Sequence, residues 1–157
     1  IMNEKNKSYE PIHTEITSLG TAAGIVESVK PGGLVAIGTK LDPSMTRSDS
    51  FIGSVIGKPG TLPDNSTLLK LDVNLFDSAV GSTVDSSEDL QVKPIQMGEL
   101  LRLNIGTAPV LGKVTKVKSS NVEIELRRPA CIFENGRVAI SRRIAERWRL
   151  IGAGIVG

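Results

Sequence analysis

One stretch decides the fold class of this chain: Leu69-Lys70-Leu71-Asp72-Val73-Asn74-Leu75. Apolar and polar residues alternate along it with a period of two, which places them on opposite faces of a β-strand. The same alternation recurs at 101–105 and 122–126. Strands with one apolar and one polar face are typical of antiparallel sheets that cover a core on one side. We therefore expect half-buried antiparallel strands.

The segments on either side of these strands extend the same interpretation. The runs 34–37 and 51–56 are apolar without alternation, which favours strands covered on both sides or strands that close a barrel. Turn-forming residues separate the runs, and Asn135-Gly136 in particular predicts a hairpin. The segment 144–149 has room for one helical turn at most. The pattern predicts an all-β sandwich or barrel.

Two segments mark the organisation of the chain. Residues 58–63 form a stiff connector of proline and glycine, so we place a domain junction there, with one domain at 1–60 and the other at 61–157. Residues 77–92 are acidic and rich in serine, which predicts a long exposed loop within the second domain.

Charge and composition narrow the class of protein. Cys131 is the single cysteine, so the chain forms no internal disulfide and no cysteine-based zinc site, which fits a reducing cytoplasm. No apolar run reaches the roughly 20 residues that span a bilayer. The net charge is 0 over 1–60, −4 over 61–97 and +6 over 98–157. The basic last third favours an anionic partner such as nucleic acid, although solvated sheet faces are also often basic.

Catalytic motifs are missing from the sequence. It contains no GxxxxGK[ST] phosphate loop, and its single histidine, His13, predicts a surface position rather than a metal ligand or a triad member. The glycines of Gly152-Ala153-Gly154 favour a closely packed strand over a dinucleotide site. We therefore expect no catalytic residue, no metal site and no cofactor in this chain, which by itself is not an enzyme.

Arginine side chains are concentrated near the C-terminal end. Seven lie within 23 residues, six of them in the paired or closely spaced positions considered as contacts, and the guanidinium group suits bidentate contacts with phosphate. Neighbours on a strand face opposite sides, so at most half of each adjacent pair can share a surface. The alternative is that they pair with Glu123, Glu125 and Glu146 across the barrel. Trp148 fits either a core anchor or a stacking platform for a base. The six are Arg127, Arg128, Arg142, Arg143, Arg147 and Arg149.

Several long motifs resemble one family. Residues 30–44, 47–49 and 53–57 are similar to the second domain of the gamma subunit of archaeal and eukaryotic translation initiation factor two. Residues 126–129, 139–144 and 147–152 resemble the end of its third domain. The wider relatives are elongation factor Tu and its selenocysteine-specific cousin. The resemblance implies two consecutive small antiparallel β-barrels, of which the first is incomplete at its N-terminal end.

The resemblance also implies binding residues. In such factors the glycine-rich segment approaches the terminal adenosine and the esterified amino acid, and glycines leave space for a ribose or base. The alternative is that these glycines only make the turn. A weaker implication places the alpha subunit on Asp42, Arg47 and Asp49. The residues expected to contact tRNA are Lys30, Pro31, Gly32, Gly33, Lys40, Arg127, Arg128, Arg142, Arg143 and Arg147.

The implied partners are initiator methionyl-tRNA, the alpha subunit and the small ribosomal subunit, in the cytoplasm and without a membrane. GTP, magnesium and the beta subunit would bind a GTP-binding domain that lies outside this sequence. One departure keeps alternatives open, because Gly152-Ala153-Gly154 resembles the elongation-factor version of that motif. The alternatives are a tRNA carrier of the selenocysteine-specific or Tu type, and a scaffold that mainly binds the alpha subunit.

Overall fold

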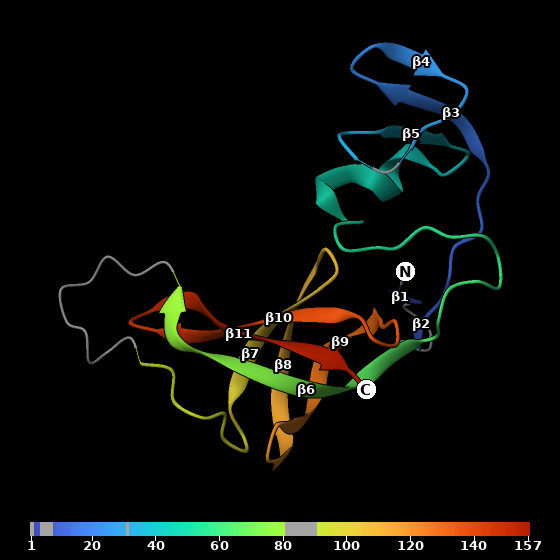
Figure 1. Ribbon diagram of the computed structural model, residues 1–157. Coiled ribbons are helices and arrows are strands. Elements are labelled where there is room, and N and C mark those ends of the chain that lie inside the picture. The colour runs from blue at the N-terminus through green and yellow to red at the C-terminus, as the bar shows by residue number, and fades with distance from the viewer. Residues whose placement is uncertain (1, 4–7, 31, 81–90) are drawn as a thin grey trace. The chain divides into compact units, whose positions relative to one another are not determined.

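The computed structural model describes residues 2–3, 8–30, 32–80 and 91–157, and it is an all-β protein (Figure 1). The chain divides into two compact units, Ile1–Phe51 and Ile52–Gly157. The domain limits predicted at 1–60 and 61–157 stay a prediction. The elements are β1 (Met2–Asn3), β2 (Ser8–Tyr9), β3 (Ile16–Thr21), β4 (Gly24–Val26), β5 (Ala36–Thr39), the 3-10 helix η1 (Pro43–Asp49), β6 (Asn65–Val80), β7 (Leu100–Ile105), β8 (Ala108–Lys118), β9 (Asn121–Cys131), β10 (Arg137–Ile144) and β11 (Arg147–Val156).

The second unit is a closed antiparallel barrel with the strand order β10-β11-β6-β9-β8-β7, and β10 pairs with β7 to close it. The predicted alternation is confirmed, because the apolar residues at 101, 103 and 105 in β7 and at 122, 124 and 126 in β9 are buried. All buried hydrophobic residues in the described part of the chain belong to this one core. Closure removes the free sheet edges and lets short alternating strands enclose a core.

Glycines let β11 pack closely against β6. A Cβ added at Gly152 would lie 2.5 Å from the carbonyl oxygen of Asn74, and one at Gly154 would lie 3.1 Å from Leu71 Cβ. Both positions face the crowded interior where two strands approach. The expectation of a packed strand at Gly152-Ala153-Gly154 is therefore confirmed.

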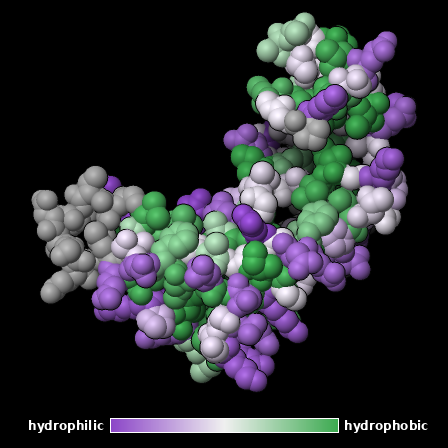
Figure 2. Space-filling view, viewed as in Figure 1, coloured by the Kyte–Doolittle hydropathy of each residue, from purple (hydrophilic) through white to green (hydrophobic). Residues whose placement is uncertain are grey.

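The first unit contains a three-stranded antiparallel sheet with the order β4-β3-β5, and a two-residue pairing of β1 with β2. Apolar residues reach its surface (Figure 2), and Leu34 is 92% exposed. None of the residues described between 9 and 51 is buried. The fold-class prediction of antiparallel β-structure holds in both units, and the closed barrel is in the second.

The two runs without alternation were predicted wrongly. Residues 51–56 form a turn and an irregular segment, with Ile52 and Ile56 exposed, and not a buried strand. In the other run, only Ala36 and Ile37 enter a strand, β5, and both are exposed. A short apolar run does not specify its own burial, because burial depends on which other segments cover it.

The structure corrects one predicted turn and defines another. Asn135-Gly136 connects β9 to β10, which are not neighbours in the barrel, so it makes a turn but no hairpin. The segment 144–149 contains no helical turn. Instead Ala145 and Glu146, with φ of 45° and 63°, make the two-residue turn of the β10–β11 hairpin. Positive φ at both central positions matches the twist of paired strands, which outweighs the preference of these residues for other conformations.

The predicted exposed loop at 77–92 is wrong at its first residues. Residues 77–80 belong to β6, and Ala79 is buried. At the other end, Ser78 pairs with Gln91, and the Val92 amide donates to the Asp77 carbonyl. The intervening residues 81–90 lie outside the described part of the chain.

Candidate nucleic-acid interface

The glycine-rich segment precedes β5. Gly32 and Gly33 have φ of 118° and 76°, in the region that favours glycine, and a Cβ added at either would meet no atom within 4 Å. The turn therefore needs glycine for its backbone conformation, and open space surrounds it. Lys30 is exposed beside it, and Pro31 lies outside the described residues. The geometry fits both the binding role and the turn role predicted for these glycines.

Lys40 follows β5 and is already paired. Its ammonium donates to the Glu15 carboxylate at 2.5 Å, and both side chains are exposed. Its amide also donates to the Glu15 carbonyl. An exposed ion pair contributes little to stability, so a phosphate could compete for this lysine at small cost.

The residues predicted for the alpha subunit lie on and beside η1. Asp42 caps this helix by accepting a hydrogen bond from the Ser44 amide at 2.8 Å. That bond holds the pKa of the exposed Asp42 carboxyl below its usual value. Arg47 and Asp49 are exposed, and Ser48 and Asp49 have φ of 56° and 57°. The helix thus presents charged side chains from an unusual, tightly turned backbone.

The C-terminal arginines do not form one cluster. Arg127 and Arg128 lie on β9, which β6 separates from β11. In the β10–β11 hairpin, Arg142 lies opposite Arg149, and Arg143 lies opposite Trp148. Directly opposite residues share a face and sequence neighbours face opposite sides. The hairpin therefore divides its arginines between two faces.

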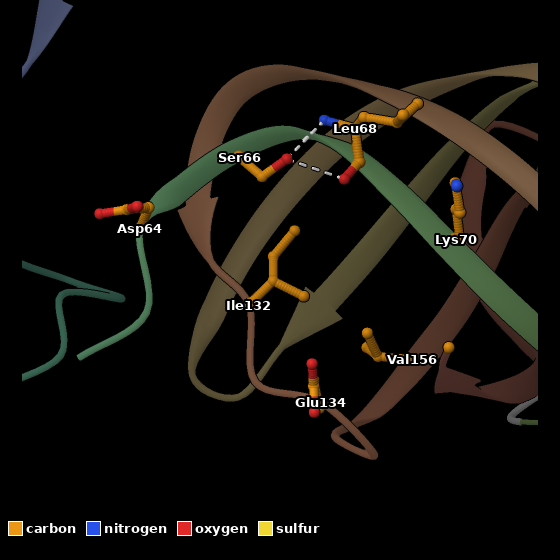
Figure 3. A pocket seen from close by; sticks show the side chains of 8 residues that line it. Asp64, Ser66, Leu68, Lys70, Ile132, Glu134 and Val156 are labelled. Carbon is orange, nitrogen blue, oxygen red and sulfur yellow. Dashed lines mark hydrogen bonds between the residues drawn. The ribbon is translucent and has the colours of Figure 1, made fainter. Parts of the chain in front are cut away.

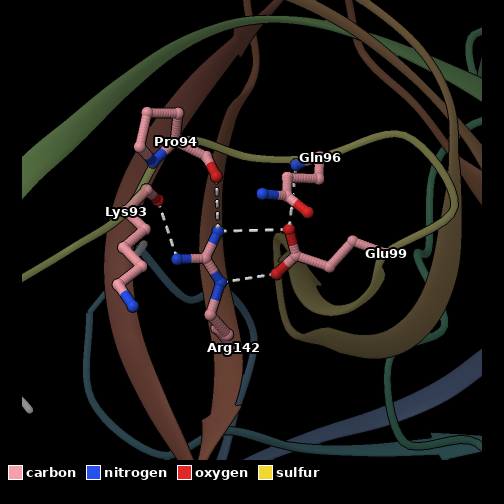
Figure 4. Close-up of polar contacts among 5 residues, drawn as sticks. All are labelled: Lys93, Pro94, Gln96, Glu99 and Arg142. Atoms are coloured by element: carbon pink, nitrogen blue, oxygen red, sulfur yellow. Dashed lines mark hydrogen bonds and ion pairs between the residues drawn. The ribbon is translucent and has the colours of Figure 1, made fainter.

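Arg142, on the same face of the hairpin as Arg149, makes its own set of polar contacts (Figure 4). Its Nε and Nη2 donate to the two carboxylate oxygens of Glu99 at 2.5 and 3.1 Å. Its Nη1 donates to the Lys93 carbonyl at 2.7 Å, and Nη2 also reaches the Pro94 carbonyl at 3.3 Å. The side chains of Arg142 and Glu99 are only 17% and 19% exposed. This guanidinium group therefore makes four hydrogen bonds within the protein.

The other predicted arginines are more available. Arg143 pairs with the exposed Glu146 across the hairpin turn, and Arg128 donates to the Pro109 carbonyl at 3.3 Å. Arg127 and Arg147 are exposed and have no hydrogen-bond or ion-pair partner among the described residues. Of the alternative pairings, the one with Glu146 occurs, whereas Glu123 binds Lys116 instead.

Trp148 belongs neither to the core nor to a fully exposed surface. It is half-buried and lies outside the barrel core. The core-anchor alternative for Trp148 is therefore wrong. Sequence reasoning also missed Glu99, which lies 43 residues from Arg142, and no spacing signal links them.

Other features of the barrel offer little chemistry. A shallow hollow of about 330 Å³ lies beside the start of β6, and Ser66, Lys70 and Glu134 are among its lining residues (Figure 3). The Ser66 hydroxyl is hydrogen-bonded to Leu68. Burial raises the pKa of the Cys131 thiol, which keeps it protonated. The described residues contain no group of three or more side chains placed to hold a metal ion.

His13 lies outside the strands and is exposed, as predicted for a surface histidine. No helix in the described ranges is long and apolar enough to cross a bilayer.

Comparison with known proteins agrees with this architecture. Residues 67–156, nearly all of the barrel, match the family model described as "Initiation factor eIF2 gamma, C terminal". This family model covers a C-terminal domain and not a catalytic one. The match covers more than half of the chain.

Individual relatives extend the match into the first unit. The chain is 48% identical to translation initiation factor 2 subunit gamma of Aeropyrum pernix over 94% of its length, and 49% identical to that of Pyrococcus furiosus over 94%. It is 45% identical to that of Archaeoglobus fulgidus over 99%. The chain spans 35–36% of the length of these relatives. Together with the barrel match, this shows that the chain belongs to the initiation factor eIF2 gamma family.

Proposed function

We propose that this chain serves in translation initiation, as the part of an initiation factor 2 gamma subunit that helps to hold initiator methionyl-tRNA. Family membership supports the role in initiation, and the net charge of +6 over 98–157 supports an RNA partner. Binding of this kind depends on phosphate contacts, which place the protein on the nucleic acid and weaken as salt rises.

The observation that carries this proposal is the pair of exposed arginines without partners. Arg127 on β9 and Arg147 on β11 present guanidinium groups from rigid barrel strands. An exposed guanidinium group without a partner in the protein can bind a phosphate without breaking an internal contact. Lys30, beside the open glycine turn, supplies a further cation from the first unit.

The rest of the assembly follows from the same family. GTP and magnesium would bind a separate domain of the parent protein, which also receives the beta subunit, and the complex would deliver tRNA to the small ribosomal subunit in the cytoplasm. The chain would take no catalytic step. The family match favours this initiation role over a selenocysteine-specific or Tu-type tRNA carrier.

A direct test is a gel-shift titration of the purified chain with methionyl initiator tRNA over a salt series, after circular dichroism has shown β-structure. We expect binding at low salt that falls as the salt rises. Lys116→Gln serves as a control variant and should bind like the wild-type chain, because Lys116 is already paired with Glu123. A folded sample that does not bind even at low salt would contradict the proposal.

A second candidate role is to bind the alpha subunit. The capped helix η1 favours it, since Arg47 and Asp49 are held exposed on a defined turn where a protein partner could pair with them. Replacing both with Ala should abolish capture of the alpha subunit and leave tRNA affinity unchanged. Retained capture would remove η1 from the interface.

A further inference from the structure

Segment Gln91–Glu99 leads directly into β7, and we call it the strap. Its backbone is tied at both ends, by the Val92 amide to the Asp77 carbonyl and by the Gly98 amide to the Val114 carbonyl. Ile95 inserts into the core between these ties. The strap therefore has a fixed path. Between the two ends, the Arg142 guanidinium group donates to the carbonyls of Lys93 and Pro94.

Arg142 and Glu99 act as a clamp on this path. The carboxylate of Glu99 accepts hydrogen bonds from both Arg142 and the Gln96 amide (Figure 4). The first bond joins the strap to β10, and the second joins two residues within the strap. Both members are largely buried. A charge-assisted pair with several hydrogen bonds and little exposure to water fixes geometry far better than a surface pair.

The clamp brings a lysine to the basic hairpin. Arg142 holds Lys93 by its backbone carbonyl only, which leaves the exposed side chain of Lys93 free of the clamp. Within the described part of the chain, the Lys93 ammonium has no hydrogen-bond or ion-pair partner. Arg149 lies opposite Arg142, and Arg147 opposite Ile144, so both point to the face where the strap lies.

We propose that Lys93 is an RNA-contacting residue, and that the Arg142–Glu99 clamp positions it beside Arg147 and Arg149. Arg142 is then a positioning residue that acts through Lys93 and does not itself contact phosphate. This inference rests on the proposed function, because it assigns a further residue to the same RNA-binding surface. Lys93 of the strap and Arg147 and Arg149 of β11 would meet the phosphate backbone there. The charge of Arg142 is neutralised by Glu99.

The test is a double-mutant cycle on binding of initiator tRNA transcript by the full chain, with Lys93→Gln, Arg142→Ala and the double variant. Lys93→Gln should reduce the slope of log affinity against log salt by about one and leave stability unchanged. Arg142→Ala should reduce the slope equally, and the double variant no further. Lys116→Gln, which removes a paired lysine, should leave the slope unchanged.

Two further measurements keep the cycle decisive. Arg142→Lys keeps the charge but cannot make the four contacts, so it should not restore the slope. Hydrogen exchange at Gln96 and Gly98 should accelerate by roughly 10- to 100-fold in Arg142→Ala and not in Lys93→Gln.

The outcomes separate this inference from the proposed function. If the wild-type chain binds RNA but Lys93→Gln binds with the same slope, Lys93 is not a contact and the inference is wrong. Additive losses in the double variant, or rescue by Arg142→Lys, would show that Arg142 contacts phosphate itself. Absence of binding by the wild-type chain would contradict the proposed function instead.

Discussion

The barrel and the N-terminal sheet differ in how they use similar residues. In the barrel, the alternating leucines, isoleucines and valines of six strands meet in one closed core. In the sheet β4-β3-β5, apolar side chains such as Ile25 and Ile37 remain exposed, as does Leu34 just before β5. Composition is β-rich in both, so the difference comes from closure. A sheet buries its apolar face only when another layer or its own curvature covers it.

Core truncation should give the largest contrast between the two units. Ile124→Ala empties a fully buried position, and we expect a loss of about 2–5 kcal/mol in the free energy of unfolding. Leu34→Ala removes a side chain that is 92% exposed and should change it by less than about 0.5 kcal/mol. Urea denaturation monitored by circular dichroism measures both, and equal effects would contradict the contrast.

Strand glycines should give the next largest contrast. Gly152→Ala places a Cβ 2.5 Å from the Asn74 carbonyl oxygen, so we expect a loss of about 1–3 kcal/mol. Gly20→Ala in the sheet meets Ala36 Cβ at an ordinary 3.5 Å and should cost less than about 1 kcal/mol. Thermal melts of the two variants test this, and a tolerated alanine at position 152 would show that β11 can move away from β6.

A substitution in the turn of the β10–β11 hairpin should give a smaller change, which is a gain in stability. Ala145 has φ of 45°, a left-handed conformation that asparagine tolerates better than alanine. Ala145→Asn should therefore stabilise the barrel by about 0.5–1 kcal/mol. The midpoint of urea denaturation would show this gain, and a lowered midpoint would exclude the strained turn.

Lowering the pH should have the smallest effect on stability, and this effect should be confined to the Asp42 cap in the first unit. The folded-state pKa of Asp42 lies below its unfolded value, because the Ser44 amide bonds to the charged carboxylate. The capping contribution is therefore present above the unfolded pKa of about 3.9 and is lost as the pH falls through the folded pKa. NMR titration of the Ser44 amide should report this transition, and Asp42→Ala should abolish it.

Local signals in the sequence were sufficient for the barrel and insufficient for its site. Alternation at 69–75, 101–105 and 122–126 depends only on neighbouring residues, so it predicts strands and their buried faces correctly. The pairing of Arg142 with Glu99 and the exposure of 51–56 depend on contacts between distant segments. A list of arginines therefore predicts basic character, but strand order decides which of them share a face.

The central claim is that exposed, unpaired cations of the barrel bind tRNA phosphates. The most direct measurement is the salt dependence of tRNA affinity for Arg127→Gln/Arg147→Gln beside Lys116→Gln, whose lysine is paired with Glu123. We predict that the double variant loses about two units of slope, because each arginine releases about one counterion. Lys116→Gln should leave the slope unchanged, since its charge is already partly neutralised by Glu123. An unchanged slope in the double variant would contradict the claim.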